Sequence, residues 1–171
     1  MTARRFACTA CGRCCYGWLP LTVDDALAHA HRFPLAMVWT PVRQGHKAFA
    51  LTARLGTTIR LPGRREAAVR IIPVAYLPPS QACPELAADG RCAIHADKPL
   101  RCRTMPFFPY AEEADQAEML MPRKGWACDV SEAAPVVYRG KEIVERGDWE
   151  AERTALKQAV PVLRRYGEAL L

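Results

Sequence analysis

The sequence predicts an α+β fold in a single small domain that covers residues 1–171. Three features support this prediction. Short, partly alternating runs of polar and apolar residues lie between residues 46 and 77, an apolar pattern with a helical period begins at about residue 149, and long stretches show neither pattern. A chain of 171 residues is long enough for one hydrophobic core but short for two independent cores.

The first predicted helix begins at Thr22. Its side chain is a suitable N-cap, and Asp24 and Asp25 follow in the first turn, where the helix dipole favours negative charge. We expect this helix to end near Arg32, because Pro34 disfavours a helical backbone at the residue before it.

Three short strands are predicted in the middle of the chain, at residues 47–51, 57–61 and 69–74. Gly56 separates the first two, and Pro62-Gly63 lies between the second and the third. We therefore expect a small antiparallel sheet or two hairpins.

The C-terminal segment, residues 149–171, is predicted to be helical. Five apolar residues recur on one stripe of this helix, with charged residues around it: Trp149, Leu156, Val160, Leu163 and Leu170. This stripe predicts a helix that faces the core, and we expect Pro161 to break or kink it.

The irregular segments carry all eight cysteines, and four of them lie between residues 8 and 15 in the pattern Cys-x-x-Cys-x-x-Cys-Cys. The equal spacing of Cys8, Cys11 and Cys14 allows one loop to direct three thiolates toward a common centre, as a metal ion or an iron–sulfur cluster requires. Adjacent side chains diverge, so we expect Cys15 to serve a second site or to support the first from another side.

The other four cysteines are more widely spaced: Cys83, Cys92, Cys102 and Cys128. The turn residues Asp89-Gly90 predict that the chain folds back, so that Cys83 and Cys92 face each other. We expect all eight cysteines to bind metal or cofactor: Cys8, Cys11, Cys14, Cys15, Cys83, Cys92, Cys102 and Cys128. His95 is not expected as a ligand, because eight thiols already satisfy two four-coordinate sites.

Four disulfides are the alternative use of eight cysteines. The cysteine cluster begins where the apolar part of a signal peptide would follow Arg4 and Arg5, so we expect a cytoplasmic protein. In that reducing compartment, clustered cysteines are metal ligands more often than they are disulfides.

These residues resemble the YkgJ family, also called the CxxCxxCC family, whose members are described as chelators of zinc or iron. The resemblance rests on Phe6-x-Cys8-x-x-Cys11-Gly12-x-Cys14-Cys15, Cys83, Cys92-x-Ile94 and Pro99-x-x-Cys102-Arg103-x-x-Pro106. Together with Cys128 these motifs define a cysteine core at about residues 6–128. The chain departs from the family pattern at His95, Lys98 and Met105, where Tyr, Arg and Phe are usual. The resemblance implies that the cysteines chelate zinc or iron.

The spacing of the first three cysteines favours an iron–sulfur cluster, of the 4Fe–4S type, over zinc. We therefore expect a metal-stabilised domain whose eight thiolates hold one or two such clusters for electron transfer or for a redox-linked modification. The alternative is a structural zinc-binding interaction module without catalysis. No Ser-His-Asp pattern, phosphate loop or His-Glu-x-x-His motif identifies catalytic residues, so the sequence leaves enzymatic activity open.

The formal charge of +6 counts the thiols as neutral. Two four-thiolate sites, each with a charge of about −2, would lower the total to roughly +2, so the basicity does not predict binding to nucleic acid. No membrane span is expected, since no apolar segment is long enough. A protein partner or redox partner is expected, but the sequence identifies neither the partner nor the oligomeric state.

Overall fold

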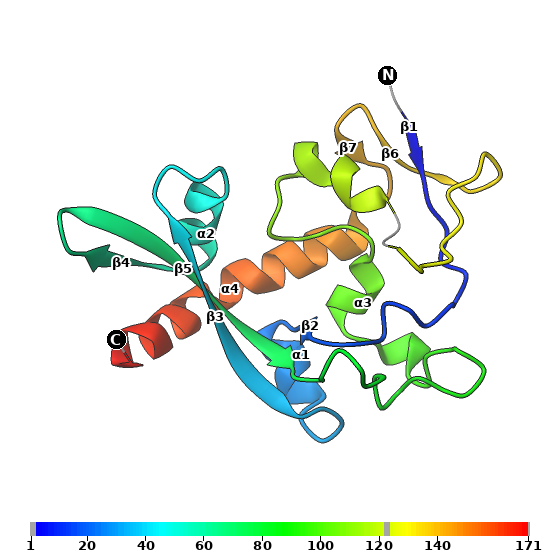
Figure 1. Ribbon diagram of the computed structural model, residues 1–171, viewed down its shortest axis with the longest axis horizontal. Helices are drawn as coiled ribbons and strands as arrows, with labels where there is room; N and C mark the ends of the chain where they lie inside the picture. The colour runs from blue at the N-terminus through cyan, green and yellow to red at the C-terminus, as the bar shows by residue number, and fades with distance from the viewer. Residues whose placement is uncertain (1–2, 122–123, 171) are drawn as a thin grey trace.

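The computed structural model describes residues 3–121 and 124–170 and has the predicted α+β architecture, with short antiparallel strands, helices and long irregular loops (Figure 1). The elements in chain order are β1 (Ala3–Arg5), β2 (Leu19–Pro20), α1 (Val23–Ala28), β3 (Leu35–Arg43), α2 (Phe49–Leu55), β4 (Thr57–Leu61), β5 (Arg65–Ala75), the 3₁₀ helix η1 (His95–Asp97), α3 (Leu100–Thr104), the 3₁₀ helix η2 (Glu113–Leu120), β6 (Val136–Arg139), β7 (Glu142–Ile143) and α4 (Gly147–Leu170).

The larger sheet is built around β5, and all its pairings are antiparallel. β3 runs along one edge of β5, from Leu35 opposite Ala75 to Arg43 opposite Ala67. β4 and β2 share the other edge, with β4 beside the first half of β5 and β2 beside its last two residues. Because β5 is flanked on both edges and covered on both faces, nearly all its residues from Ala67 onward are buried.

Two hydrophobic clusters hold helices against this sheet. One joins β5 to the second half of α4 through Val69, Ile71, Ala159 and Leu163. The other joins β5 to α2 through Leu51, Leu55, Ile72 and Val74, together with Tyr110 and Leu156. Val69 and Ile71 alternate with Ile72 and Val74 across the strand, so the two clusters lie on opposite faces of the sheet.

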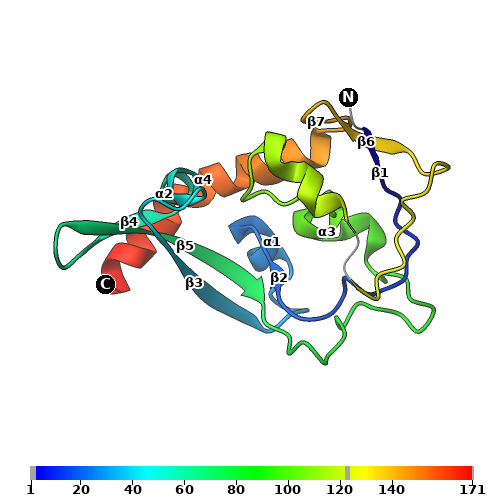
Figure 2. The same cartoon turned by 45° about the horizontal axis from the view of Figure 1, so that its top comes forward.

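A second, three-stranded sheet has the order β1-β6-β7. Its cluster contains Phe107, Leu120, Tyr138, Ile143 and Trp149. Trp149 lies in the first turn of α4, so this one helix packs against both sheets and connects the two ends of the molecule, as Figures 1 and 2 show.

The predicted strands at residues 57–61 and 69–74 are confirmed as β4 and part of β5. The strand predicted at 47–51 is wrong, because α2 begins at Phe49. Leu51, Thr52 and Leu55 are all buried at helical spacing, and their contact with β5 outweighs the short alternating pattern. β3 was not predicted; it contains Pro41, which an edge strand tolerates.

Both predicted helices are present. Thr22 caps α1, accepting a hydrogen bond from the backbone N–H of Asp25 at 3.0 Å, but the helix ends at Ala28 and turns replace its expected last residues. α4 confirms the C-terminal helix, and it continues through Pro161, so the expected break is wrong, while the alternative of a kink at Pro161 stays a prediction. Ala159 and Leu163, on either side of Pro161, are buried against β5, and this packing compensates for the missing N–H.

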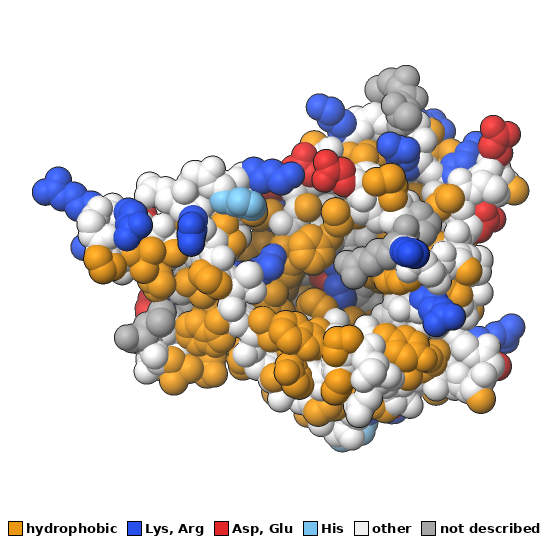
Figure 3. Space-filling model, viewed as in Figure 1, with side chains coloured by type: hydrophobic (Ala, Val, Ile, Leu, Met, Phe, Trp, Pro, Cys, Tyr) orange, Lys and Arg blue, Asp and Glu red, His pale blue; other side chains and the backbone are white. Residues whose placement is uncertain are grey.

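The irregular segments gather beside α3, on the right-hand side of Figures 1 and 2. The face drawn in Figure 3 is hollowed near its middle, with hydrophobic side chains around the hollow and most Lys and Arg side chains toward the periphery. None of the helices in the described part of the chain has the length and apolar character needed to cross a membrane.

Candidate metal centre

The first cysteine loop connects β1 to β2 and contains a tight turn at Gly12. Gly12 has a φ of +68°, a left-handed conformation that costs glycine little, and its carbonyl accepts a hydrogen bond from the N–H of Cys15 at 3.0 Å. A Cβ at this position would approach Leu86 Cδ1 to 3.1 Å. Gly12 therefore permits both the turn and the close approach of the second cysteine loop.

The beginning of this loop is paired with the segment that carries Cys128. Ala7 and Asp129 exchange backbone hydrogen bonds of 2.8 and 3.0 Å in an antiparallel bridge, and Thr9 Oγ1 donates to the carbonyl of Ala127 at 2.9 Å. Cys8 and Cys128 follow and precede the bridged residues, so the bridge brings them together. The thiols of Cys8 and Cys11 are both close enough to Cys128 to act on it electrostatically.

The end of the first loop is paired with the second cysteine loop. The N–H of Cys83 donates to the carbonyl of Cys15 at 2.7 Å, and Tyr16 and Ala82 form an antiparallel bridge beside this bond. The second loop folds back at Gly90, whose φ is +82°. An antiparallel bridge between Leu86 and Cys92 closes it. Cys83 and Cys92 interact electrostatically across this turn, as the sequence predicts.

Cys102 comes from α3. Neighbouring Arg101 is almost completely buried and holds α3 against α4 through Glu152, with 3.3 Å between Arg101 Nη1 and Glu152 Oε2. Arg101 also donates to the carbonyl of Phe107. From this helix the Cys102 thiol interacts with those of Cys14, Cys83 and Cys92.

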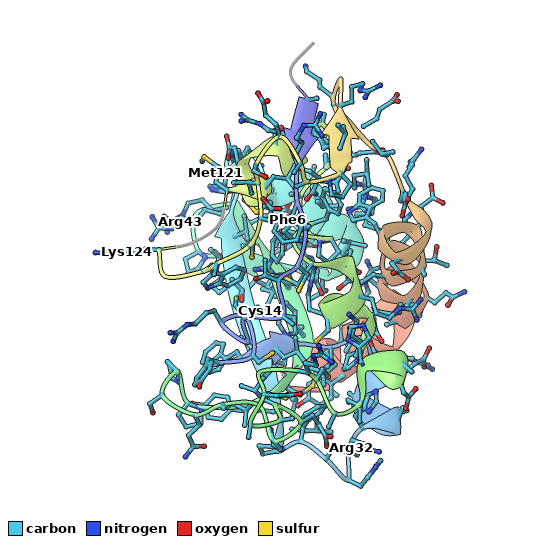
Figure 4. All side chains as sticks on the ribbon, turned by 90° about the vertical axis from the view of Figure 1, so that its right-hand side faces the viewer. Phe6, Cys14, Arg32, Arg43, Met121 and Lys124 are labelled. Carbon is cyan, nitrogen blue, oxygen red and sulfur yellow. The ribbon has the colours of Figure 1, made fainter. Side chains whose placement is uncertain are left out.

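The fold thus brings the eight cysteines into two neighbourhoods that meet at Cys14 and Cys15. Cys8, Cys11 and Cys128 form one, and Cys15, Cys83, Cys92 and Cys102 form the other. Cys14 interacts with members of both and lies near the middle of Figure 4, which looks onto the cysteine loops. In the described ranges, 3–121 and 124–170, no three Cys, His, Asp or Glu side chains converge closely enough to hold a metal ion as they stand, and all eight thiols are free of disulfides.

A family model described as "Putative zinc- or iron-chelating domain" and named CxxCxxCC matches residues 7–129. The chain belongs to this family. The matched range covers most of the chain and extends from just before Cys8 to just after Cys128, so it contains both neighbourhoods. Comparison with curated proteins and with solved structures finds no match.

The membership confirms the resemblance drawn from the cysteine motifs and supports metal chelation by this CxxCxxCC domain, by zinc or by iron. It does not distinguish between the two metals. The eight predicted ligands all lie within the matched range.

The adjacent thiols of Cys14 and Cys15 have opposite electrostatic properties. A hydrogen bond from the Cys15 side chain stabilises the Cys14 thiolate and lowers the pKa of Cys14 to about 6. The same hydrogen bond, together with burial, raises the pKa of Cys15. As the pH increases, Cys14 therefore loses its proton before Cys15 does.

The remaining shifts follow burial and backbone contacts. Burial raises the pKa of Cys102 to about 12 and also raises the pKa values of Cys83 and Cys128. Backbone hydrogen bonds from Arg13 and Ala127 lower the pKa of Cys11. The first neighbourhood thus contains one thiol with a lowered pKa, Cys11, and one with a raised pKa, Cys128, whereas the pKa values of Cys15, Cys83 and Cys102 in the second are all raised.

Arg13, Arg101 and Arg103 each lie next to a cysteine in the sequence, and the structure separates their roles. Arg13 contributes its backbone to Cys11, Arg101 pairs with buried Glu152, and Arg103 pairs with Asp148 on the surface. Lys98 is a cation whose role the sequence did not predict: its charge contributes to the lowered pKa of Cys14 and offsets a small part of the rise in the pKa of Cys102. Its place next to Pro99 in the family motif, where Arg is usual, was the available signal.

Proposed function

We propose that this chain binds iron in iron–sulfur clusters through two four-thiolate sites. Cys8, Cys11, Cys14 and Cys128 would hold the first site, and Cys15, Cys83, Cys92 and Cys102 the second. The observation that carries this proposal is the division of the eight thiols into two neighbourhoods that meet at Cys14-Cys15.

The donor set fits the proposed group. Thiolates are soft ligands that suit iron–sulfur clusters and zinc, and four per site satisfies either. The first three ligands of the first site have the spacing that favours a cluster.

The protonation of the thiols and the charge beside them are also consistent with metal binding. The raised pKa values of Cys15, Cys83 and Cys102 keep these thiols protonated, so metal binding would release their protons. Lys98, which already acts on Cys14 and Cys102, would offset part of the negative charge of the thiolates. Affinity for metal should therefore increase with pH.

A bound cluster would supply one-electron redox chemistry, and we propose electron transfer, or a redox-linked modification, as the role of the centre. The chain would hold the clusters with the help of the loop between β1 and β2, next to the exposed aromatic side chains of Tyr16 and Trp18. The cytoplasmic location expected from the sequence remains a prediction.

Pairs of cysteine substitutions test the division into two sites. Cys8→Ser should lose about half of the bound iron, and Cys8→Ser/Cys128→Ser should lose no more, because both ligands belong to one site. Cys8→Ser/Cys92→Ser should lose all of it. Iron and acid-labile sulfide are measured per chain after anaerobic purification, with circular dichroism to check folding.

Two results would contradict the division. Complete loss of iron in folded Cys8→Ser would indicate a single shared centre. An additive loss in Cys8→Ser/Cys128→Ser would place these two ligands in different sites.

A further inference from the structure

An open pocket of about 400 Å³ lies where three of the four cysteine-bearing segments meet. The described residues that line it are Arg13, Tyr16, Pro79, Lys124, Gly125 and Trp126. Arg13 and Tyr16 flank Cys14-Cys15, Pro79 precedes Cys83, and residues 124–126 precede Cys128. The pocket therefore adjoins the candidate metal centre without containing any of its proposed ligands.

The described residues of the pocket carry positive charge. Arg13 and Lys124 are both cations, and no acidic side chain is among the described lining residues. Among the residues that the structure describes, neither cation forms an ion pair, whereas other exposed arginines such as Arg54 do. Two cations beside one cavity repel each other unless an anion lies between them.

The remaining lining is aromatic or apolar. Tyr16, Trp126 and Pro79 contribute three rings, and Tyr16 is 44% exposed. Aromatic side chains provide flat surfaces for planar groups, and a volume of about 400 Å³ lies within the range of small-molecule sites. Lys124 extends from the edge of the molecule in Figure 4.

We propose that this pocket binds a small planar anion: a ring compound with a carboxylate or phosphate group. The ring contacts Tyr16 and Trp126, and the anionic group pairs with Arg13 and Lys124. An occupant lies beside Cys14-Cys15, which would make it a candidate reactant or regulator of the metal centre. That last step rests on the proposed function, whereas the binding itself does not.

Calorimetric titration of the full-length, anaerobically purified protein tests the ligand chemistry. Benzoate and phenyl phosphate are the probes, acetate and inorganic phosphate carry the charge alone, and benzyl alcohol carries the ring alone. The ring anions should bind at least about tenfold more tightly than any of the three partial probes, because only they use both kinds of contact. Equal affinity of the ring anions and the partial probes would overturn the proposal.

Matched substitutions test the place of binding. Lys124→Gln and Arg13→Gln should each weaken the binding of phenyl phosphate by about tenfold, because each removes a charged hydrogen-bond donor. Lys157→Gln, the same change at an exposed position on α4 outside the pocket, should have no effect. Unchanged binding in both pocket variants would overturn the proposal.

Metal content, measured on each protein, separates this proposal from the proposed function. Tight binding of phenyl phosphate to wild-type protein that contains no metal would support the pocket and contradict the metal centre. Stoichiometric metal in a protein that does not prefer ring anions would support the metal centre and contradict the pocket. A pocket variant that keeps its metal and loses phenyl phosphate supports the pocket specifically.

Discussion

Two adjacent cysteines at the centre of the candidate site have opposite tendencies to lose a proton. The hydrogen bond from the Cys15 side chain stabilises the Cys14 thiolate, and the charge of that thiolate disfavours ionisation of Cys15. The Cys-Cys pair thus places one ready thiolate and one protonated thiol where the two neighbourhoods meet. The sequence predicted that Cys15 would serve a second site or support the first from another side, but the unequal pKa values of Cys14 and Cys15 depend on contacts that only the fold provides.

The reactivity of Cys14 in metal-free protein should show this difference. Its pKa of about 6 lies below the ordinary value of 9.0, so Cys14 is mostly thiolate at about pH 7 and should react first with iodoacetamide. Its rate should increase through about pH 6 and level off by about pH 8, whereas Cys102, with a pKa of about 12, should still be gaining reactivity there. Mass spectrometry of peptides after brief alkylation measures both rates. A Cys14 rate that increases further between about pH 8 and pH 9.5 would contradict the assignment.

The buried ion pair between Arg101 and Glu152 fixes the helix that carries Cys102. Both side chains are about 5% exposed or less, and burial raises the pKa of Glu152 despite the nearby guanidinium. Within the described residues, Arg101 Nη1 and Glu152 Oε2 make no hydrogen bond, so the contact is electrostatic. A buried pair of this kind is costly to break on one side only.

Arg101→Met should lower the free energy of unfolding by about 3–5 kcal/mol, because it leaves the Glu152 carboxylate buried without its cation. Arg101→Met/Glu152→Leu should recover most of this loss, since it removes both charges. Urea unfolding of the single and double variants measures the difference. Equal stability of the two variants would show that the ion pair is not the origin of the effect.

At the scale of elements, the junction between α2 and β4 packs closely against the backbone of β5. Gly56 connects the two, and a Cβ there would collide with the carbonyl oxygen of Val69 and lie 3.0 Å from that of Thr52. Both are backbone atoms, which cannot rotate away from the new Cβ as the end of a side chain could. The glycine therefore sets how closely α2 can approach β5.

Gly56→Ala should destabilise the protein by about 1–3 kcal/mol, the usual cost of overpacking, through the displacement of α2 or β5. Gly147→Ala is the matched control, because a Cβ at Gly147 meets no atom within 4 Å and lies at the start of α4. Thermal unfolding of the two variants measures the contrast. A Gly56→Ala variant as stable as Gly147→Ala would contradict the described packing.

The sequence correctly predicted those elements in which the spacing of apolar residues matches the spacing of the residues that the fold buries, or in which the signal is local. The apolar stripe that begins at Trp149 predicted α4 because one long helix packs along most of it. Thr22 could be predicted as an N-cap because capping depends only on neighbouring residues. The strand prediction for residues 47–51 was wrong because a run of only five residues fits both the two-residue period of a strand and the 3.6-residue period of a helix. β3 was not predicted because it is an edge strand that contains Pro41 and has no fully buried residue.

At the scale of the whole molecule, the candidate centre is assembled from segments far apart in the chain. The sequence could identify the eight cysteines and the turn between Cys83 and Cys92, because both are local patterns. It could not assign Cys128 to the neighbourhood of Cys8, because that depends on the bridge between Ala7 and Asp129. Nor could it place the Arg13–Lys124 pocket, whose lining comes from three segments.

The metal content of the native protein tests the central claim most directly. Wild-type protein purified without oxygen should be brown, absorb near 400 nm as cubane clusters roughly do, contain iron and acid-labile sulfide in equal amounts, and lose its colour in air. A colourless anaerobic protein with stoichiometric zinc would contradict the iron–sulfur claim and favour a structural zinc module. A folded protein with neither metal would contradict the metal centre itself.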